Sequence, residues 1–133
     1  VEFLEQDAAN LQLNEAFDFI TTFDAVHDQA RPRKMVSGIY ASLKPGGYWL
    51  CADLCASSHL GENLDHPIGT FGYTVSCMHC MSVSLAYEGE GLGAMWGAQK
   101  AREIFTDAGF KVEEVKRVDG DAGNNYYLCS RQN

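Results

Sequence analysis

The stretch FDFITTFDAVHD, residues 17–28, holds the clearest strand signal in this chain of 133 residues. Its first part is rich in β-branched and aromatic residues, and it is apolar enough for a central strand of a parallel sheet. Asp24 follows this run directly, and His27 and Asp28 come just beyond it. In open α/β sheets, ligands bind outside the carboxyl ends of the strands. The stretch therefore predicts both an α/β fold and the place of its functional site.

The segments on either side alternate between strand and helix patterns. After residue 31, apolar residues recur at three- and four-residue spacing up to residue 43, which indicates a helix. LKPGG, residues 43–47, ends this helix and turns the chain into a strand at residues 48–54. Upstream, residues 1–6 are a further strand candidate.

The C-terminal third predicts a helix and a hairpin. Apolar residues line one face of a helix at residues 94–108, and Gly109 suits its C-terminal cap. Residues 110–118 and 125–131 are strand candidates, and the DGDAGN segment between them is typical of an antiparallel hairpin. The predicted fold class is thus α/β, with parallel strands, flanking helices and a C-terminal antiparallel hairpin.

Between these regions, residues 55–93 lose all regular periodicity. The segment contains three of the four histidines of the chain. A loop of this length is uncommon in a compact domain unless it is functional. We expect one partial domain over residues 1–133, with an inserted lid or substrate-binding segment at about residues 55–93 and some helix at residues 75–86.

Composition excludes several classes of partner. The net charge is −8 and Lys and Arg do not cluster, so neither nucleic acid nor an anionic membrane surface is an expected partner. No apolar run is long enough to span a membrane, and the first residues lack the features of a signal peptide. The odd number of cysteines fits reduced thiols, with Cys51 and Cys129 in the core. These features indicate a cytoplasmic protein.

One acid stands at or just past the end of each of three predicted strands: Asp7, Asp24 and Asp53. Acids at this edge of a sheet can accept hydrogen bonds from the amino or hydroxyl groups of a nucleoside. Asp is also a frequent capping residue at the start of a following helix or turn. For each acid, we weigh capping and ligand contact about equally on this rule.

Four segments, taken in order, resemble the consecutive motifs that follow the glycine loop of class I S-adenosylmethionine-dependent methyltransferases. They are VEFLEQDAANL, AFDFITTFDAVHD, SLKPGGYWLCAD and the helix that ends in DAGF. The similarity spans nearly the whole chain, and LKPGG before a strand is its most telling part. The segment HPIGTFGYTVSCMHCMSVSL also resembles a methyltransferase subgroup with a winged-helix-like N-terminal domain. The resemblance implies a Rossmann-like sheet, S-adenosylmethionine as the cofactor and methyl transfer to a small-molecule substrate by the full-length protein.

The resemblance also implies roles for individual residues. Asp7 matches the acid that binds the adenine amino group, and Ala8 the residue whose backbone N–H faces the ring. Phe23 and Asp24 match the residues that line the methionine part of the cofactor. These four residues are the expected cofactor-binding set.

Three residues are candidates for catalysis. By the resemblance, His27 flanks the adenine or the reacting centre, and Asp53 lies at the mouth of the transfer site. His79, in the inserted segment, has a side chain whose ordinary pKa is near neutral and could serve as a base. Each of the three would be needed as a base only if the methyl acceptor must lose a proton.

One departure from the family pattern stands out. No strand followed by GxGxG is present, and GEGLG, residues 89–93, has no strand before it. We therefore expect an incomplete cofactor pocket, an enzyme in the full-length protein and an inactive fragment on its own. The strand at residues 1–6 would lack its neighbours, which predicts an exposed sheet edge and self-association through it.

Two alternatives to methyl transfer remain, and the first rests on the CMHC segment, residues 77–80. Cys77 and Cys80 form one metal-ligand pair where a structural zinc site uses two, so we expect no metal. A non-enzymatic metal-binding or interaction module built on CMHC remains an alternative function, in which Cys77 would be a ligand. A nicotinamide-dependent oxidoreductase fragment is another, and it predicts a parallel strand at the end of the chain.

Overall fold

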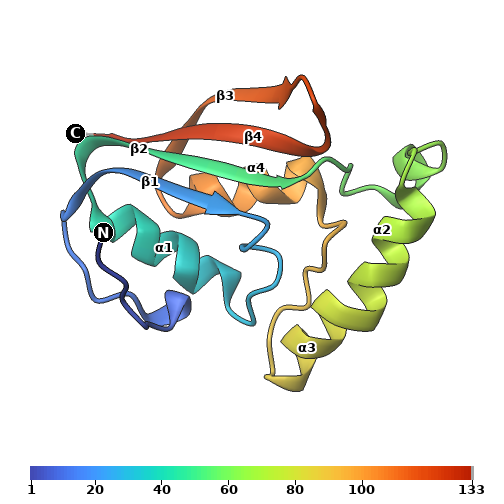
Figure 1. Ribbon diagram of the computed structural model, residues 1–133, viewed down its shortest axis with the longest axis horizontal. Helices are drawn as coiled ribbons and strands as arrows, with labels where there is room; N and C mark the ends of the chain where they lie inside the picture. The colour runs from blue at the N-terminus through green and yellow to red at the C-terminus, as the bar shows by residue number, and fades with distance from the viewer. Residues whose placement is uncertain (133) are drawn as a thin grey trace.

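The computed structural model describes residues 1–132, apart from the side chain of Ala122. Four strands form one mixed sheet in the order β1-β2-β4-β3. The strands are β1 (Phe17–Phe23), β2 (Leu43–Leu54), β3 (Phe110–Val118) and β4 (Asp121–Arg131). β1 and β2 are parallel, whereas β4 is antiparallel to both of its neighbours, β2 and β3 (Figure 1). The predicted α/β class with its C-terminal hairpin is confirmed.

β2 is an inner strand, and its side chains alternate between two environments. Trp49, Cys51 and Asp53 are fully buried on one face, whereas Tyr48 is exposed on the other. β2 begins at Leu43, earlier than predicted, because the LKPGG segment stays next to β1 as an irregularity in the pairing. Gly46 has a φ of 75° there, a conformation that glycine adopts without strain.

The helices α1 (Pro32–Ser42) and α4 (Gly97–Asp107) cover the same face of the sheet (Figure 1). α4 begins three residues later than predicted. Aromatic side chains fill the space between α4 and the sheet: Trp49, Phe105, Phe110 and Tyr127 are all buried. In the described part of the chain, no helix has the length and apolar character needed to cross a membrane.

The inserted segment forms a helical arm beside the sheet. After the short turn η2 (Leu60–Asn63), three helical stretches follow without a break: α2 (Gly69–Val75), η3 (Ser76–Cys80) and α3 (Met81–Ala86). We call residues 69–86 the arm; it lies next to the ends of β1 and β2 (Figure 1). The arm includes the predicted helix at residues 75–86 but begins earlier, because η3 is a π-helical turn that continues α2.

The strand predicted at residues 1–6 is wrong, since these residues have no regular secondary structure. The chain then forms the short turn η1 (Ala8–Asn10) and packs against α1, with Leu11 against the hydrophobic core. A strand needs a partner for its backbone groups, and residues 1–6 find none in the sheet. Among the described residues β1 is consequently an edge strand, and not the central strand that its apolar sequence predicted.

Gly97 allows the inserted segment to lie directly on the start of α4. Its φ is 82°, and a Cβ atom there would lie 2.1 Å from the backbone nitrogen of Ser58. We expect Gly97→Ala to lower the free energy of unfolding by about 2–3 kcal/mol. The alanine would be strained at this positive φ, and its Cβ would also clash with the backbone of Ser58. Urea unfolding measures this, with Gly61→Ala as the control, since a Cβ at Gly61 meets nothing within 4 Å. Equal stability of both variants would contradict the prediction.

Candidate active site

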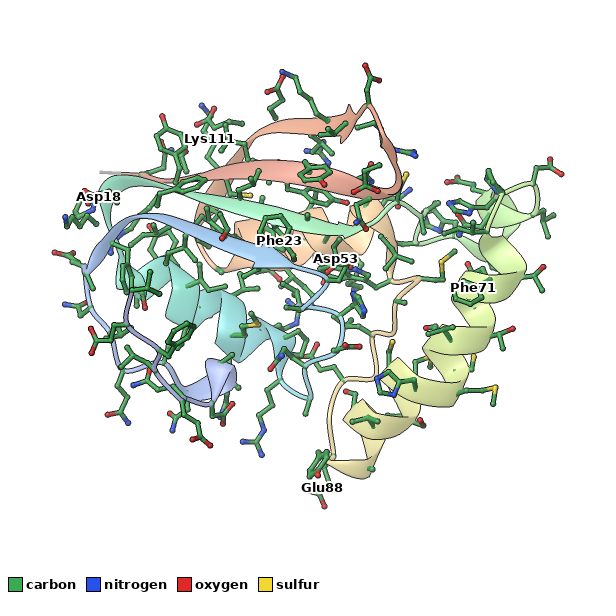
Figure 2. The ribbon with its side chains drawn as sticks, viewed as in Figure 1. Asp18, Phe23, Asp53, Phe71, Glu88 and Lys111 are labelled. Carbon is green, nitrogen blue, oxygen red and sulfur yellow. The ribbon has the colours of Figure 1, made fainter. Side chains whose placement is uncertain are left out.

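The carboxyl ends of β1 and β2 bring three polar side chains together. Asp24 directly follows β1, His27 lies in the loop after it, and Asp53 is near the end of β2. One side-chain N or O atom from each residue lies within 4.8 Å of the other two. Figure 2 shows Asp53 close to Phe23, the last residue of β1, at this edge of the sheet. The parallel pairing of β1 and β2 creates this cluster, because parallel strands end on the same side.

His27 and Asp53 form a short, buried hydrogen bond. The distance from His27 Nδ1 to Asp53 Oδ1 is 2.6 Å, and the two residues are 4% and 0% exposed. Because an ionised carboxylate only accepts hydrogen bonds, Nδ1 carries the hydrogen and donates it. The second nitrogen, Nε2, lies 3.3 Å from Asp28 Oδ1, and the imidazole ring is fixed in one orientation.

Asp53 is itself held by two further donors. The indole Nε1 of Trp96 donates to Asp53 Oδ1 over 3.1 Å, and the backbone N–H of Leu54 donates over 2.9 Å. The other carboxylate oxygen, Oδ2, is buried and accepts no hydrogen bond among the described residues. A buried acceptor without a partner is costly, and such atoms are concentrated at functional sites.

The electrostatics of this cluster follow from burial and from its negative charges. Burial opposes the charged imidazolium, but the hydrogen bond and the charge of Asp53 outweigh it, so the pKa of His27 lies above its ordinary value of 6.5. Burial, and next the charge of Asp53, raises the pKa of Asp24 above 3.8. The cluster thus favours a positively charged group beside it.

The end of β1 remains open on the side of Asp24. Phe23 is 59% exposed, and Asp24 has a φ of 46°, a left-handed conformation that is rare for residues other than glycine. Strained backbone of this kind persists where the surrounding structure holds it, and it is frequent at ligand sites. Phe23 and Asp24 thus lie together at the carboxyl end of β1.

Asp7 and Ala8 lie outside this cluster. Asp7 accepts a hydrogen bond from the backbone N–H of Ala9 over 2.9 Å and so caps η1. η1 packs against α1. Of the two roles weighed for Asp7, the structure contains capping, and the adenine contact expected for Asp7 and Ala8 stays a prediction.

The CMHC segment lies in η3 of the arm, and its residues point in different directions. Cys77 and His79 are exposed, whereas Cys80 is 4% exposed. The Cys80 thiol lies within 4.8 Å of His27 and Asp28. Burial, and next the Asp28 carboxylate, raises the pKa of Cys80 to about 11. The two cysteines therefore belong to different environments, and His79 is not part of the buried network.

Sequence reasoning placed Asp28 beside His27 and paired Cys80 with Cys77, but it did not predict that Cys80 lies near His27 and Asp28 or that Trp96 donates to Asp53. Trp96 precedes α4 directly, and Cys80 lies in the arm. Both are more than 40 residues beyond His27 in the chain. Only long-range contacts bring them to the strand ends.

Residues 1–115 match a family model described as a methyltransferase domain. Among curated proteins, no significant sequence match is found. Many solved structures are similar to this chain in fold. Three of them share less than 20% sequence identity with it.

An S-adenosylmethionine-dependent methyltransferase from Methanosarcina mazei shares 16% identity with a TM-score of 0.66, covering 98% of this chain and 67% of that one. A second such enzyme, from Thermotoga maritima, shares 18% identity with a TM-score of 0.67, covering 97% and 63%. An O-methyltransferase family protein from Burkholderia thailandensis shares 19% with a TM-score of 0.67, covering 98% and 36%. The chain thus spans about two thirds or less of these three proteins.

A mixed sheet of this order, with a cluster of polar residues at the carboxyl ends of its parallel strands, defines a Rossmann-like α/β domain. The chain belongs to the methyltransferase domain family, whose model matches residues 1–115. The predicted resemblance to class I methyltransferases is confirmed.

Proposed function

We propose that the complete protein transfers a methyl group from S-adenosylmethionine to a small-molecule acceptor. Membership of the methyltransferase domain family supports the reaction, and the S-adenosylmethionine-dependent enzymes among the structural neighbours support the cofactor. The observation that carries the proposal is the 2.6 Å hydrogen bond between His27 and Asp53 at the carboxyl ends of β1 and β2.

The residues at this edge fit part of the cofactor. S-adenosylmethionine carries an ammonium group, hydroxyl groups and a sulfonium centre that makes its methyl group electrophilic. The unpartnered Oδ2 of Asp53 and the carboxylate of Asp24 are acceptors suited to such groups. Phe23, exposed beside Asp24, offers an apolar surface to the methionine part. We therefore assign Phe23 and Asp24 to the cofactor side of the site.

His27 is the residue that we assign to the acceptor. Because Nδ1 donates to Asp53, Nε2 is the nitrogen that can take a proton from an acceptor hydroxyl, thiol or amine. Asp53 acts as a positioning residue, since it fixes the ring and stabilises the imidazolium that forms. His79 is exposed on the arm and has no comparable support, so we do not assign it a catalytic role.

Charge favours a small acceptor over a nucleic acid. The net charge of −8 opposes binding to a polyanion. The terminal hairpin argues against a nicotinamide-dependent oxidoreductase, which would end in a parallel strand. Self-association through the free edge of β1, and a cytoplasmic location, remain part of this proposal.

A methyl-transfer assay tests the proposal. The complete protein is incubated with S-adenosylmethionine labelled in its methyl group and with a panel of phenols, thiols and amines. We expect label in the small-molecule fraction for at least one acceptor class. We also expect calorimetry to detect no micromolar S-adenosylmethionine binding to residues 1–133 alone. Label found only in protein or nucleic acid, or a complete protein that does not bind S-adenosylmethionine, would refute the proposal.

A further inference from the structure

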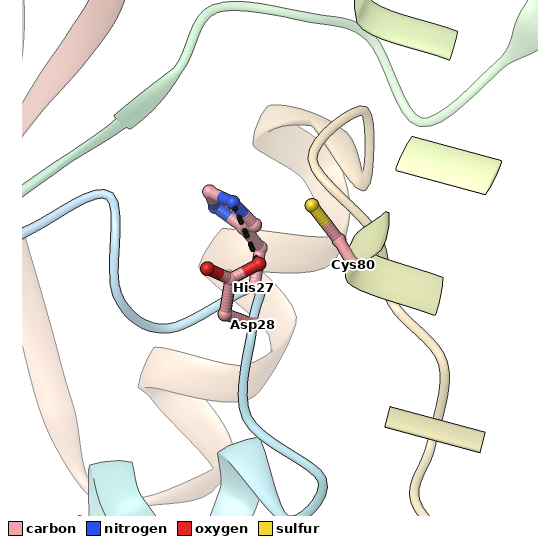
Figure 3. A group of neighbouring side chains, drawn as sticks. All are labelled: His27, Asp28 and Cys80. Carbon is pink, nitrogen blue, oxygen red and sulfur yellow. Dashed lines mark ion pairs between the residues drawn. The ribbon is translucent and has the colours of Figure 1, made fainter. Parts of the chain in front are cut away.

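His27, Asp28 and Cys80 converge from two separate parts of the fold. His27 and Asp28 lie in the loop between β1 and α1, and Cys80 is the last residue of η3 in the arm. A ring nitrogen of His27, an Asp28 carboxylate oxygen and the Cys80 sulfur all lie within 4.8 Å of one another, and His27 Nε2 is 3.3 Å from Asp28 Oδ1. Figure 3 shows the Cys80 side chain directed from the arm toward the other two. We propose that these three residues bind a divalent cation of the zinc class.

The donor set suits that cation. Imidazole nitrogen, thiolate sulfur and carboxylate oxygen are the three protein ligand types of zinc, and three of them leave a fourth position open. The distance from His27 Nε2 to Asp28 Oδ1 is 3.3 Å. Two such ligands at the corners of a tetrahedron around zinc lie about 3.3 Å apart, given metal–ligand distances of about 2.0–2.1 Å. The Cys80 thiol would release its proton as the cation binds, and one carboxylate with the resulting thiolate would then balance the charge of the cation.

A second observation points to a ligand between these groups. Asp28 Oδ1 is buried and accepts no hydrogen bond among the described residues; it lies 3.3 Å from His27 Nε2, with which it forms an ion pair only when the imidazole is protonated. Leaving a buried carboxylate oxygen without a partner costs free energy. A cation held between Oδ1 and Nε2 would supply the missing partner.

The environment of His27 is that of a metal-binding histidine. Such histidines almost always donate their other ring N–H to a carboxylate or carbonyl, which fixes the ring and makes it a stronger ligand. His27 donates Nδ1–H to Asp53, and Trp96 in turn holds Asp53. Nε2, which faces Asp28, is therefore the nitrogen that would bind a cation when the imidazole is neutral.

The cation would join the arm to the carboxyl ends of the strands, because its ligands come from both. The site needs only these three side chains and does not depend on methyl transfer. A cation and a proton are alternative occupants of Nε2, so the cation-loaded protein would not offer His27 as a base.

Cobalt(II) titration of the chelator-treated, reduced protein tests the proposal. We expect one equivalent of Co²⁺ to give the visible absorption of a tetrahedral site together with a thiolate-to-cobalt band, and zinc to displace it. A dissociation constant above about 10 µM for zinc, or a spectrum without the thiolate band, would overturn the proposal.

Matched variants assign the ligands. Cys80→Ser should remove the thiolate band and weaken zinc binding by about 100-fold or more, whereas Cys77→Ser, at an exposed position, should change neither. The opposite result, with loss only in Cys77→Ser, would overturn the proposal in favour of a site built on CMHC. Asp28→Asn, checked for its fold by circular dichroism, should weaken zinc binding about 10- to 100-fold, and unchanged binding would contradict its role as a ligand.

Discussion

Replacement of His27 by glutamine is expected to lower the rate of methyl transfer by the complete protein about 10²- to 10⁴-fold. This range is the usual contribution of a positioned general base. Glutamine can still donate a hydrogen bond to Asp53, so the buried carboxylate keeps a partner. It cannot take a proton from the acceptor, however. Initial rates at saturating S-adenosylmethionine, measured in chelator-treated protein, report this step directly.

Two further measurements make the result specific. His59→Gln removes an exposed histidine from the inserted segment, and we expect its rate to stay within about threefold of the unchanged protein. S-adenosylmethionine should bind the His27 variant with nearly the same affinity, because His27 is assigned to the acceptor. If His27→Gln keeps its full rate with every acceptor that loses a proton, His27 is not the base.

The central sheet was predictable because its strands carry strong local signals. FDFITTF forms β1 with the predicted bounds, and the strand predicted at residues 110–118 is β3. The turn chemistry after residue 118 correctly predicted the hairpin, but the turn is shorter than predicted, since β4 begins at Asp121 and not at Asn125. In these segments, local propensity and tertiary pairing favour the same structure.

Residues 1–6 show where a local pattern fails. Val1, Phe3 and Leu4 alternate with polar residues only in part, and all three are exposed in the structure. A strand is stabilised by pairing with a neighbour, and no such pairing forms here. The pattern could not reveal this, because it carries no information about the partner.

The candidate site was predictable in the part that topology fixes. The rule for parallel strands placed Asp7, Asp24 and Asp53 at one edge, with His27 just beyond Asp24. The structure brings Asp24, His27 and Asp53 within 4.8 Å of one another, whereas Asp7 caps η1 instead. The rule could not predict that Trp96 would donate a hydrogen bond to Asp53, or that η3 would bury Cys80 and leave Cys77 exposed. Those contacts depend on how the arm and α4 pack.

The core that supports this site depends strongly on Trp49. Its side chain is fully buried in β2, beside Phe105 at a ring-centroid distance of 4.6 Å and Phe110 at 5.1 Å. Its indole Nε1 also donates to Thr22 Oγ1 of β1 over 3.0 Å. One residue thus joins β1, α4 and β3 on the helix-covered face of the sheet.

We expect Trp49→Ala to lower the free energy of unfolding by about 3–5 kcal/mol, the usual cost of removing a large buried aromatic side chain. Such a loss is a large part of the about 5–15 kcal/mol that stabilises a typical domain. Tyr48→Ala is the matched control, since the adjacent side chain lies on the other face of β2 and is 44% exposed. We expect the control to lose about 1 kcal/mol or less. In urea unfolding, the two variants should therefore differ in the midpoint concentration of the transition and have similar m-values. A smaller loss of stability for Trp49→Ala than for Tyr48→Ala would show that the main core does not lie on the helix-covered face.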